Sequence, residues 1–163
     1  GINDEARESR LAAIQAAGMV RSTEAVDKLI SVIERSDYQD ERLAATMSLG
    51  FIGDDRSVPI LNELLADEEP NIRWDAAIAL AKMGEISSAP IIENLMDRNY
   101  LTTFPELDPK EVNKVILTAI ETSSLMKYDR FEPKLVLLAE SDENLKVRDA
   151  AIKMLKKSYN RII

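Results

Sequence analysis

The chain contains neither histidine nor cysteine, and this limits the chemistry that its side chains can perform. Ser-His-Asp and Cys-His nucleophile systems, most zinc sites and the usual axial haem ligands all need one of these residues. Carboxylates, lysines, arginines and hydroxyls remain. We therefore expect no catalytic residues, no metal site and no cofactor, and we interpret the protein as a non-enzyme.

Two short motifs could carry chemistry, but each has a structural explanation. Gly53-Asp54-Asp55 could hold a cation, although an Asp at the start of a helix usually accepts hydrogen bonds from free backbone N–H groups. Ser124 and Lys127 match the S-x-x-K pattern, but its companion motifs are missing and the pair falls at the end of an expected helix. We interpret the first motif as a helix cap and the second as a chance match.

An acidic turn, Asp67-Glu68-Glu69, is interpreted as solvated. Here we expect Asp67 to reach Arg73, and Asp142 to reach Arg148, six residues further on in each case. Such partly exposed pairs stabilise a fold by about 1 kcal/mol or less. Their expected role is to tie each turn to the helix that follows it.

These residues are positioned by a helical repeat. Its clearest column is an arginine that recurs after 32 and then 31 residues, a spacing typical of helical solenoids. Small or aliphatic residues follow each arginine at offsets of three, seven and ten, which places all of them on one helix face. The column arginines are Arg10, Arg42, Arg73 and, near the end, Arg148, and the residues at offset three are Ala13, Ala45, Ala76 and Ala151.

A second helix repeats in the same rhythm, over 26–35, 58–67, 89–98 and, more distantly, 131–141. Pro59, Pro90 and Pro133 share one column, and proline is tolerated in the first turn of a helix. Each of these helices has one apolar face that it cannot bury alone, so neighbouring units must cover it. The apolar columns consist of Leu29, Leu61, Ile92 and Leu135, then Val32, Leu64, Leu95 and Leu138.

We expect one repeat domain over residues 1–163, as part of a longer chain. An insertion at 99–108 interrupts the rhythm, and Asp108 with Glu111 predicts a capped helix from Pro109 to about Ser124. Gly18 is expected near the end of the first helix. The predicted units are 4–35, 40–67, 71–98, 109–141 and a partial unit at 142–163.

Within Arg42–Asp54 the chain has R-x-x-A followed by L-G-x-I-G-D, and V-P-x-L and D-E-E-P-N-I-R follow up to Arg73. These motifs resemble the HEAT-like repeats of the phycocyanobilin-lyase type. The resemblance implies an all-α, right-handed α-solenoid of about four and a half helical hairpins. Among relatives of this repeat type, deoxyhypusine hydroxylases bind iron through paired His-Glu motifs, and this chain has none. HEAT-like DNA glycosylases present a cationic groove, and the acidic composition of this chain argues against one. No missing residue excludes a bilin lyase of this repeat type, so that activity stays an open alternative.

The net charge of −8 bears on the partners that the chain can bind. A nucleic-acid binder needs a cationic surface, so DNA and RNA are excluded as expected partners, and anionic membranes are disfavoured too. No apolar run approaches the ~18 residues of a membrane span. A cytoplasmic location is favoured, but the chain begins with Gly1, which indicates a trimmed N-terminus and leaves export open. The oligomeric state is not predicted.

The expected working surface is the exposed stripe of the second helices, which the resemblance places on the concave side. Of twelve stripe positions, five are acidic and none is basic. This stripe is either an ordinary solvated face or a groove for a basic or mixed peptide. The candidate partner-binding residues on it are Asp27, Ile30, Glu34, Asn62, Glu93, Asp97, Val136 and Glu140.

The insertion is the second candidate surface. Long loops in compact arrays tend to be functional, and aromatic residues are common interface anchors. The alternative is that the segment folds back over its own units. The candidate residues are Tyr100, Leu101, Phe104 and Leu107, whereas Trp74 is expected to pack between helices.

Together these features favour a non-catalytic scaffold that binds a protein or peptide segment, with a basic segment as one candidate. Two alternatives stay open. The chain could be a regulatory or lyase-type domain of an enzyme system acting on a cofactor or chromophore, which would need a pocket with a perturbed carboxylate or lysine. It could also be a purely structural segment of a longer solenoid.

Overall fold

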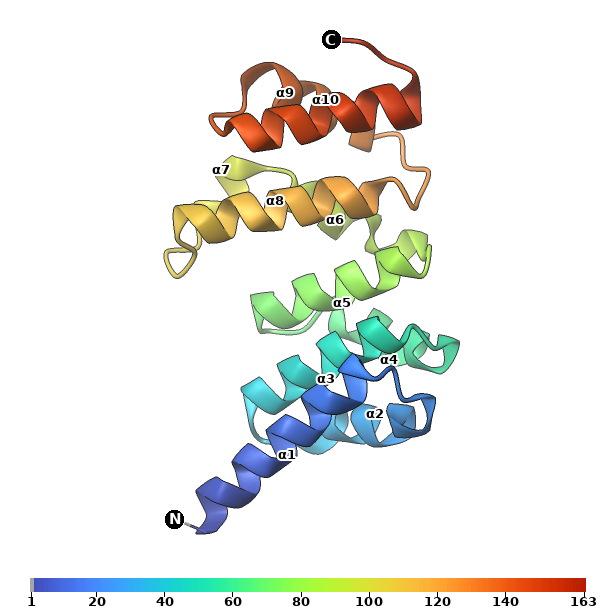
Figure 1. Cartoon of the computed structure of the whole chain (residues 1–163), viewed down its shortest axis with the longest axis vertical. Coiled ribbons are helices and arrows are strands. Elements are labelled where there is room, and N and C mark those ends of the chain that lie inside the picture. The colour runs from blue at the N-terminus through green and yellow to red at the C-terminus, as the bar shows by residue number, and fades with distance from the viewer. Residues whose placement is uncertain (1) are drawn as a thin grey trace. The chain divides into compact units, whose positions relative to one another are not determined.

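The structure, a computed structural model, describes residues 2–163, with side chains from residue 4 onward, and these residues form helices joined by turns (Figure 1). The chain divides into two compact units, Gly1–Met83 (unit 1) and Gly84–Ile163 (unit 2). The boundary falls inside the predicted repeat 71–98, between its two helices. The predicted all-α solenoid of helical hairpins is confirmed.

Unit 1 consists of two layers of helices. In the first layer α3 lies between α1 and α5, and in the second layer α2 packs on α3 while α4 packs on α5. Short 3-10 turns, η1 (Thr23–Ala25) and η2 (Asp55–Ser57), lead into α2 and α4. The helices are α1 (Ile2–Met19), α2 (Val26–Arg35), α3 (Gln39–Ile52), α4 (Val58–Leu64) and α5 (Pro70–Lys82).

Unit 2 repeats this plan with one added element. α10 packs on both α9 and α8, α6 packs on α8, and the short α7 contacts α6 and α8. The 3-10 turn η3 (Ile86–Ser88) leads into α6. The helices are α6 (Ala89–Leu95), α7 (Arg98–Leu101), α8 (Pro109–Ser123), α9 (Phe131–Ser141) and α10 (Leu145–Tyr159).

The predicted apolar columns form the cores of the two units. The four residues of the leucine/isoleucine column of the second helices are at most 2% exposed. The alanines at offset three are fully buried in α3, α5 and α10, but Ala13 is exposed in α1. The reason is that α2 and α4 cover α3 and α5, whereas no second helix precedes α1 among the described residues.

The helix predicted from Pro109 is α8, and its start is a capping box. The Asp108 side chain accepts from the Glu111 N–H at 2.8 Å, and the Glu111 carboxylate accepts from the Asp108 N–H at 2.8 Å. Two otherwise free backbone donors are thereby satisfied. This cap fixes the residue at which the helix after the insertion begins.

Gly18 lies near the end of the first helix, as predicted, and it also has a packing role. It lies inside α1, which continues to Met19, and it faces α3. A Cβ atom at Gly18 would lie 2.7 Å from the Cα of Ser48 and 2.5 Å from its Oγ. The Ser48 hydroxyl donates to the carbonyl of Ile14 at 2.8 Å, which fixes the two helices at this close distance. Gly18 is therefore a packing residue near the end of α1.

The chain turns after α1, α3 and α5 through a left-handed backbone conformation. Gly53 and Gly84 hold this position with φ of 67° and 77°. Arg21, 32 residues before Gly53, adopts φ of 52° at the same place in the repeat. A left-handed conformation costs an L-residue with a Cβ about 1–2 kcal/mol, so the first turn is strained where the next two are not.

We expect Gly18→Ala to destabilise the protein by about 1–3 kcal/mol, because the new methyl group would meet the α3 backbone. Helix propensity alone predicts the opposite sign, since Ala is favoured over Gly inside a helix by roughly 0.5–1 kcal/mol. Urea unfolding followed by circular dichroism measures the difference. A gain in stability would show that α1 and α3 are not in close contact here.

We expect Arg21→Gly to stabilise the protein by about 0.5–1 kcal/mol, since glycine relieves the left-handed strain but makes the unfolded chain more flexible. Arg21→Ala is the matched control, because it removes the same side chain and charge yet keeps the Cβ. Thermal unfolding of both variants separates the two effects. Equal gains would assign the effect to the lost charge and not to the backbone.

Candidate functional site

The predicted acidic stripe is exposed in unit 1. Asp27 and Glu34 lie seven residues apart on one face of α2, and the opposite face of this helix is buried through Leu29 and Ile33. The Asp27 side chain is 82% exposed, with the Arg56 guanidinium 3.7 Å away. This face of α2 therefore presents two carboxylates on a helix held rigidly by its core contacts.

The other two predicted residues of unit 1, Ile30 and Asn62, carry no charge. Ile30 and Asn62 are half-buried, and the Asn62 amide donates to the carbonyl of Val58 at 3.1 Å. On α4 the exposed Glu63 adds a carboxylate that the predicted stripe did not include.

In unit 2 two of the three predicted acidic residues, Glu93 and Asp97, are engaged in ion pairs. Glu93 is only 7% exposed, and its carboxylate lies 3.1 Å from Nε of Arg130 and accepts from the hydroxyl of Tyr128 at 3.4 Å. Asp97 caps α7 through the Tyr100 N–H and lies 3.4 Å from Nζ of Lys134. These contacts join α6 to the segment that contains α9, so the two carboxylates are structural.

Sequence reasoning missed this pairing because Arg130 and Lys134 lie outside the columns of the stripe. Val136 is half-buried, and Glu140 is exposed. The carboxylates of Glu93 and Asp97 are thus neutralised by Arg130 and Lys134, whereas Asp27 on α2 has only the more distant Arg56 at 3.7 Å.

The insertion folds back at one of its four predicted residues. Leu101, the last residue of α7, is fully buried. Tyr100, Phe104 and Leu107 are half-buried, and the rings of Tyr100 and Phe104 meet edge to face with centroids 5.2 Å apart. The aromatic pair stiffens the loop. Its role as a partner-binding surface stays a prediction.

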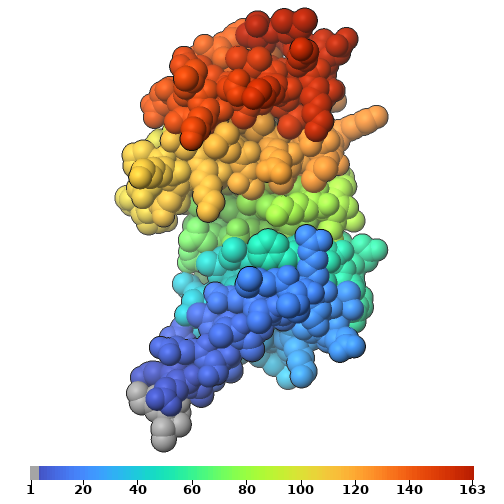
Figure 2. Space-filling view, in the orientation of Figure 1, coloured from blue at the N-terminus to red at the C-terminus, as the bar shows by residue number. Residues whose placement is uncertain are grey.

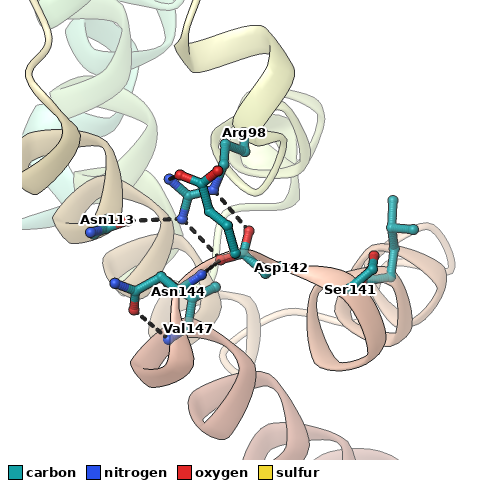
Figure 3. A network of polar contacts seen from close by, with 8 residues as sticks. Arg98, Asn113, Ser141, Asp142, Asn144 and Val147 are labelled. Atoms are coloured by element: carbon teal, nitrogen blue, oxygen red, sulfur yellow. Dashed lines mark hydrogen bonds and ion pairs between the residues drawn. The ribbon is translucent and has the colours of Figure 1, made fainter.

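An arginine network lies beside the insertion (Figure 3). Nε and Nη2 of Arg98 each donate to one carboxylate oxygen of Asp142 at 2.9 Å, and Nη2 also donates to the Asn113 Oδ1 at 2.8 Å. The Asp142 side chain is 3% exposed. The hydrogen bonds that Arg98 donates to Asp142, together with the charges of Asp142 and Glu143, raise the pKa of Arg98 despite partial burial. The predicted pairing of Asp142 with Arg148 is wrong, because Arg98, 44 residues earlier, occupies both oxygens.

The corresponding pair in unit 1 joins Arg42 to Asp67, with Nη2 and Oδ2 2.5 Å apart. Arg73 does reach this turn, but through the backbone carbonyls of Asp67 and Glu68, at 2.7 and 3.2 Å. Burial raises the pKa of Asp67, but hydrogen bonds from Arg42 and from the Glu69 N–H outweigh it, so the pKa is lowered overall. The column arginine of one unit thus holds the turn that leads into the next.

The two short motifs have the predicted structural roles. The Asp54 side chain accepts from the Arg56 N–H at 2.9 Å and so caps η2. The Ser124 hydroxyl donates to the carbonyl of Glu121 at 2.9 Å, and no hydrogen bond joins it to Lys127. Within residues 4–163 no three Asp or Glu side chains are placed to hold a metal ion. In the same part of the chain, no helix combines the length and apolar character needed to cross a bilayer.

One cavity lies beside a predicted site residue of unit 2, and another lies in unit 1 away from the predicted site residues. One of about 310 Å³ in unit 2 is lined by Asp97, Arg98, Lys134 and Asp142, whose charges are already paired. Another of about 410 Å³ in unit 1 lies between α1 and α3 and is mainly apolar. Sequence reasoning missed the second one, although exposed apolar residues at helical spacing could have indicated it. It is lined by Leu11, Gln15, Met19, Asp40, Leu43, Ala44, Met47, Ser48 and Phe51.

One carboxyl group has a strongly perturbed pKa. Burial raises the pKa of Asp75 to about 6, although the charge of Lys82 lowers it in part. Asp75 stands where the repeat has Ala12 and Ala44. A perturbed carboxyl group can mark a functional site, but the cavities described above are not lined by Asp75.

Comparisons with known proteins agree with this architecture. A family model described as HEAT repeats matches residues 1–67 and 26–103. Among solved structures, a chain of the complex of CpcE and CpcF of phycocyanin lyase from Nostoc sp. PCC7120 is similar, with a TM-score of 0.64 and 23% sequence identity. The match covers 93% of the present chain and 60% of that one, so the present chain spans little more than half of its length. At this identity the likeness concerns the fold. No curated protein matches the chain.

We expect Asp75→Asn to stabilise the protein at neutral pH by about 1–3 kcal/mol, because ionising a partly desolvated carboxyl group in the folded state is unfavourable. The folded-state pKa of about 6 lies above the reference value of 3.8. The penalty is therefore full above pH 6, shrinks as the pH falls towards 4 and vanishes below it.

Urea unfolding of both proteins across this pH range measures the difference. Asp37→Asn, in an exposed turn, makes the same chemical change at a solvated position and serves as the control. A stability difference for Asp75→Asn that does not change between pH 4 and 7.5 would contradict the assignment.

Proposed function

Because the chain belongs to the HEAT-repeat family, we propose that it is a non-catalytic scaffold that binds a basic peptide or protein segment. The binding surface is the exposed face of α2 and α4 in unit 1. The observation that carries the proposal is the placement of Asp27 and Glu34 on one rigid helix face, with Glu63 on the next second helix. Arrays of stacked hairpins commonly bind partners in this way.

The physical advantage of this surface is preorganisation. α2 is anchored by Val26, Leu29 and Ile33, which are 4% exposed or less, so its carboxylates need little ordering when a partner binds. Affinity then depends mainly on the contacts formed and less on the entropy lost by the scaffold. Carboxylates at this spacing attract lysines or arginines placed about two helical turns, or roughly 10 Å, apart.

The proposal is narrower than the stripe expected from the sequence. Glu93 and Asp97 are taken up by Arg130 and Lys134, and they contribute structure more than charge to a partner. Glu140 remains exposed in unit 2, and the insertion residues remain a second candidate surface.

The second candidate function is a lyase-type domain that acts on a chromophore or cofactor. Two observations favour it, one chemical and one structural. Asp75 supplies a carboxyl group with a raised pKa, and the similar solved chain belongs to the complex of CpcE and CpcF of phycocyanin lyase. The lack of a cavity beside Asp75 among those described above weighs against it. Scaffold function is therefore preferred.

The expected outcome is that Asp27→Lys/Glu34→Lys weakens binding of a lysine- and arginine-rich peptide about ten-fold, which corresponds to about 1.4 kcal/mol. A fluorescein-labelled Lys/Arg-rich peptide library screened by anisotropy supplies the probe. The matched control is Glu5→Lys/Glu8→Lys, which makes the same charge change at two exposed positions of α1.

Loss of affinity in both double variants would indicate attraction to the net charge and not to α2. No loss in either would place the binding surface elsewhere.

A further inference from the structure

We propose that the groove between α8 and α10 of unit 2 binds a short acidic segment of a partner protein that carries a leucine-like anchor. This site is separate from the surface of α2, and its expected partner has the opposite charge. The two helices lie side by side, and both face the viewer in the space-filling view, where α8 is yellow to orange and α10 is red (Figures 1 and 2).

The groove is lined by a set of side chains that are mostly hydrogen-bond donors. Its volume is about 610 Å³. Positions three, four, seven and eight residues apart on α8 face it, and the first turn of α10 closes its other side. The lining residues are Lys110, Asn113, Lys114, Leu117, Thr118, Glu121, Asn144, Leu145 and Lys146.

The three lysines are exposed and carry no ion pair within the described part of the chain. The acidic side chains closest to them in sequence are engaged elsewhere. Glu111 accepts from the Asp108 N–H, and Glu143 lies 3.5 Å from Arg98. Neither of these two carboxylates pairs with the lysines, and the one carboxylate in the lining of the groove is that of Glu121.

The side-chain amides of Asn113 and Asn144 each have their oxygen engaged in a hydrogen bond within the protein. The Oδ1 of Asn113 accepts from Arg98 and that of Asn144 accepts from the Val147 N–H (Figure 3). Their NH₂ groups are thereby left to donate towards a ligand. A donor-rich lining fits a ligand rich in acceptors, such as carboxylates.

The position of the lysines is unfavourable for the helices themselves. Lys110 lies in the first turn of α8 and Lys146 in the first turn of α10. A cation near a helix N-terminus is disfavoured by the helix dipole, and an acidic residue would stabilise the helix there. Residues that break a local stability rule are expected at functional sites. Stability does not account for these lysines, whereas an anionic ligand does.

A short peptide fits better than a long polyanion. Leu145 is 70% exposed and Leu117 is half-buried, so the groove offers apolar contact between its charges. Glu121 lies at the far end, about 16 Å along α8 from Lys110, and limits the length of acidic chain that can bind. The net charge of −8 repels a nucleic acid or an anionic bilayer over a large surface, but beyond about 8 Å it is largely screened for a short segment.

The test is anisotropy titration of the full chain with a fluorescein-labelled peptide of repeating Glu-Glu-Leu units at an ionic strength of about 0.15 M, where the Debye length is about 8 Å. We expect measurable binding that weakens ten-fold or more in Lys110→Ala/Lys114→Ala/Lys146→Ala. The matched control, Lys156→Ala/Lys157→Ala, removes two exposed lysines from the last turn of α10, outside the groove, and should leave the affinity unchanged.

Equal affinity in the triple variant and the control, or no binding by the unmodified protein, would overturn the proposal. Oligo-dT and phosphatidylserine vesicles are titrated alongside, and tighter groove-dependent binding of either would overturn the choice of a peptide. Binding of the basic peptide at α2 should not change in the triple variant, so failure of one proposal is distinguishable from failure of the other.

Discussion

Close approach of the first helices is the constraint on which the structure of unit 1 depends. α1 reaches α3 where Gly18 meets Ser48, and α3 reaches α5 where a Cβ on Gly50 would lie 3.0 Å from that of Ala79. Only small residues permit this spacing, because packed interiors have little room for an extra methyl group. With the first helices this close, the second helices can cover the next unit, and the apolar columns become continuous cores.

Arginine–carboxylate pairs complement this apolar packing at the turns. Arg42 holds Asp67 in unit 1, and Arg98 holds Asp142 in unit 2. The paired carboxylates are largely buried, so losing one partner would leave a poorly solvated charge. Acidic residues that look available in the sequence, such as Asp67 and Asp142, are in this way committed to structure, and the partner surfaces proposed above lie on other residues.

The sequence predicts the helices well because their pattern is local and recurs several times. It places Asp108 as a cap and the proline column at helix starts, both of which depend on neighbours within one turn. It does not predict that Asp142 pairs with Arg98, since the insertion changes which arginine is near. It places Gly18 near the end of α1 but does not show its close contact with Ser48, because that residue belongs to another helix. The pairing of Glu93 with Arg130 was missed for a similar reason, since the partner comes from another hairpin.

The groove between α1 and α3 has a consequence for the chemistry of the surface under oxidising conditions. Met19 is 81% exposed and Met47 is 45% exposed, and both line this groove beside Phe51. The chain has no thiol to react first, so exposed thioethers are its accessible sulfur atoms. Conversion to the sulfoxide would replace an apolar, flexible lining by strong dipoles, and a methionine sulfoxide reductase could restore it. The character of this face therefore depends on the redox history of the molecule.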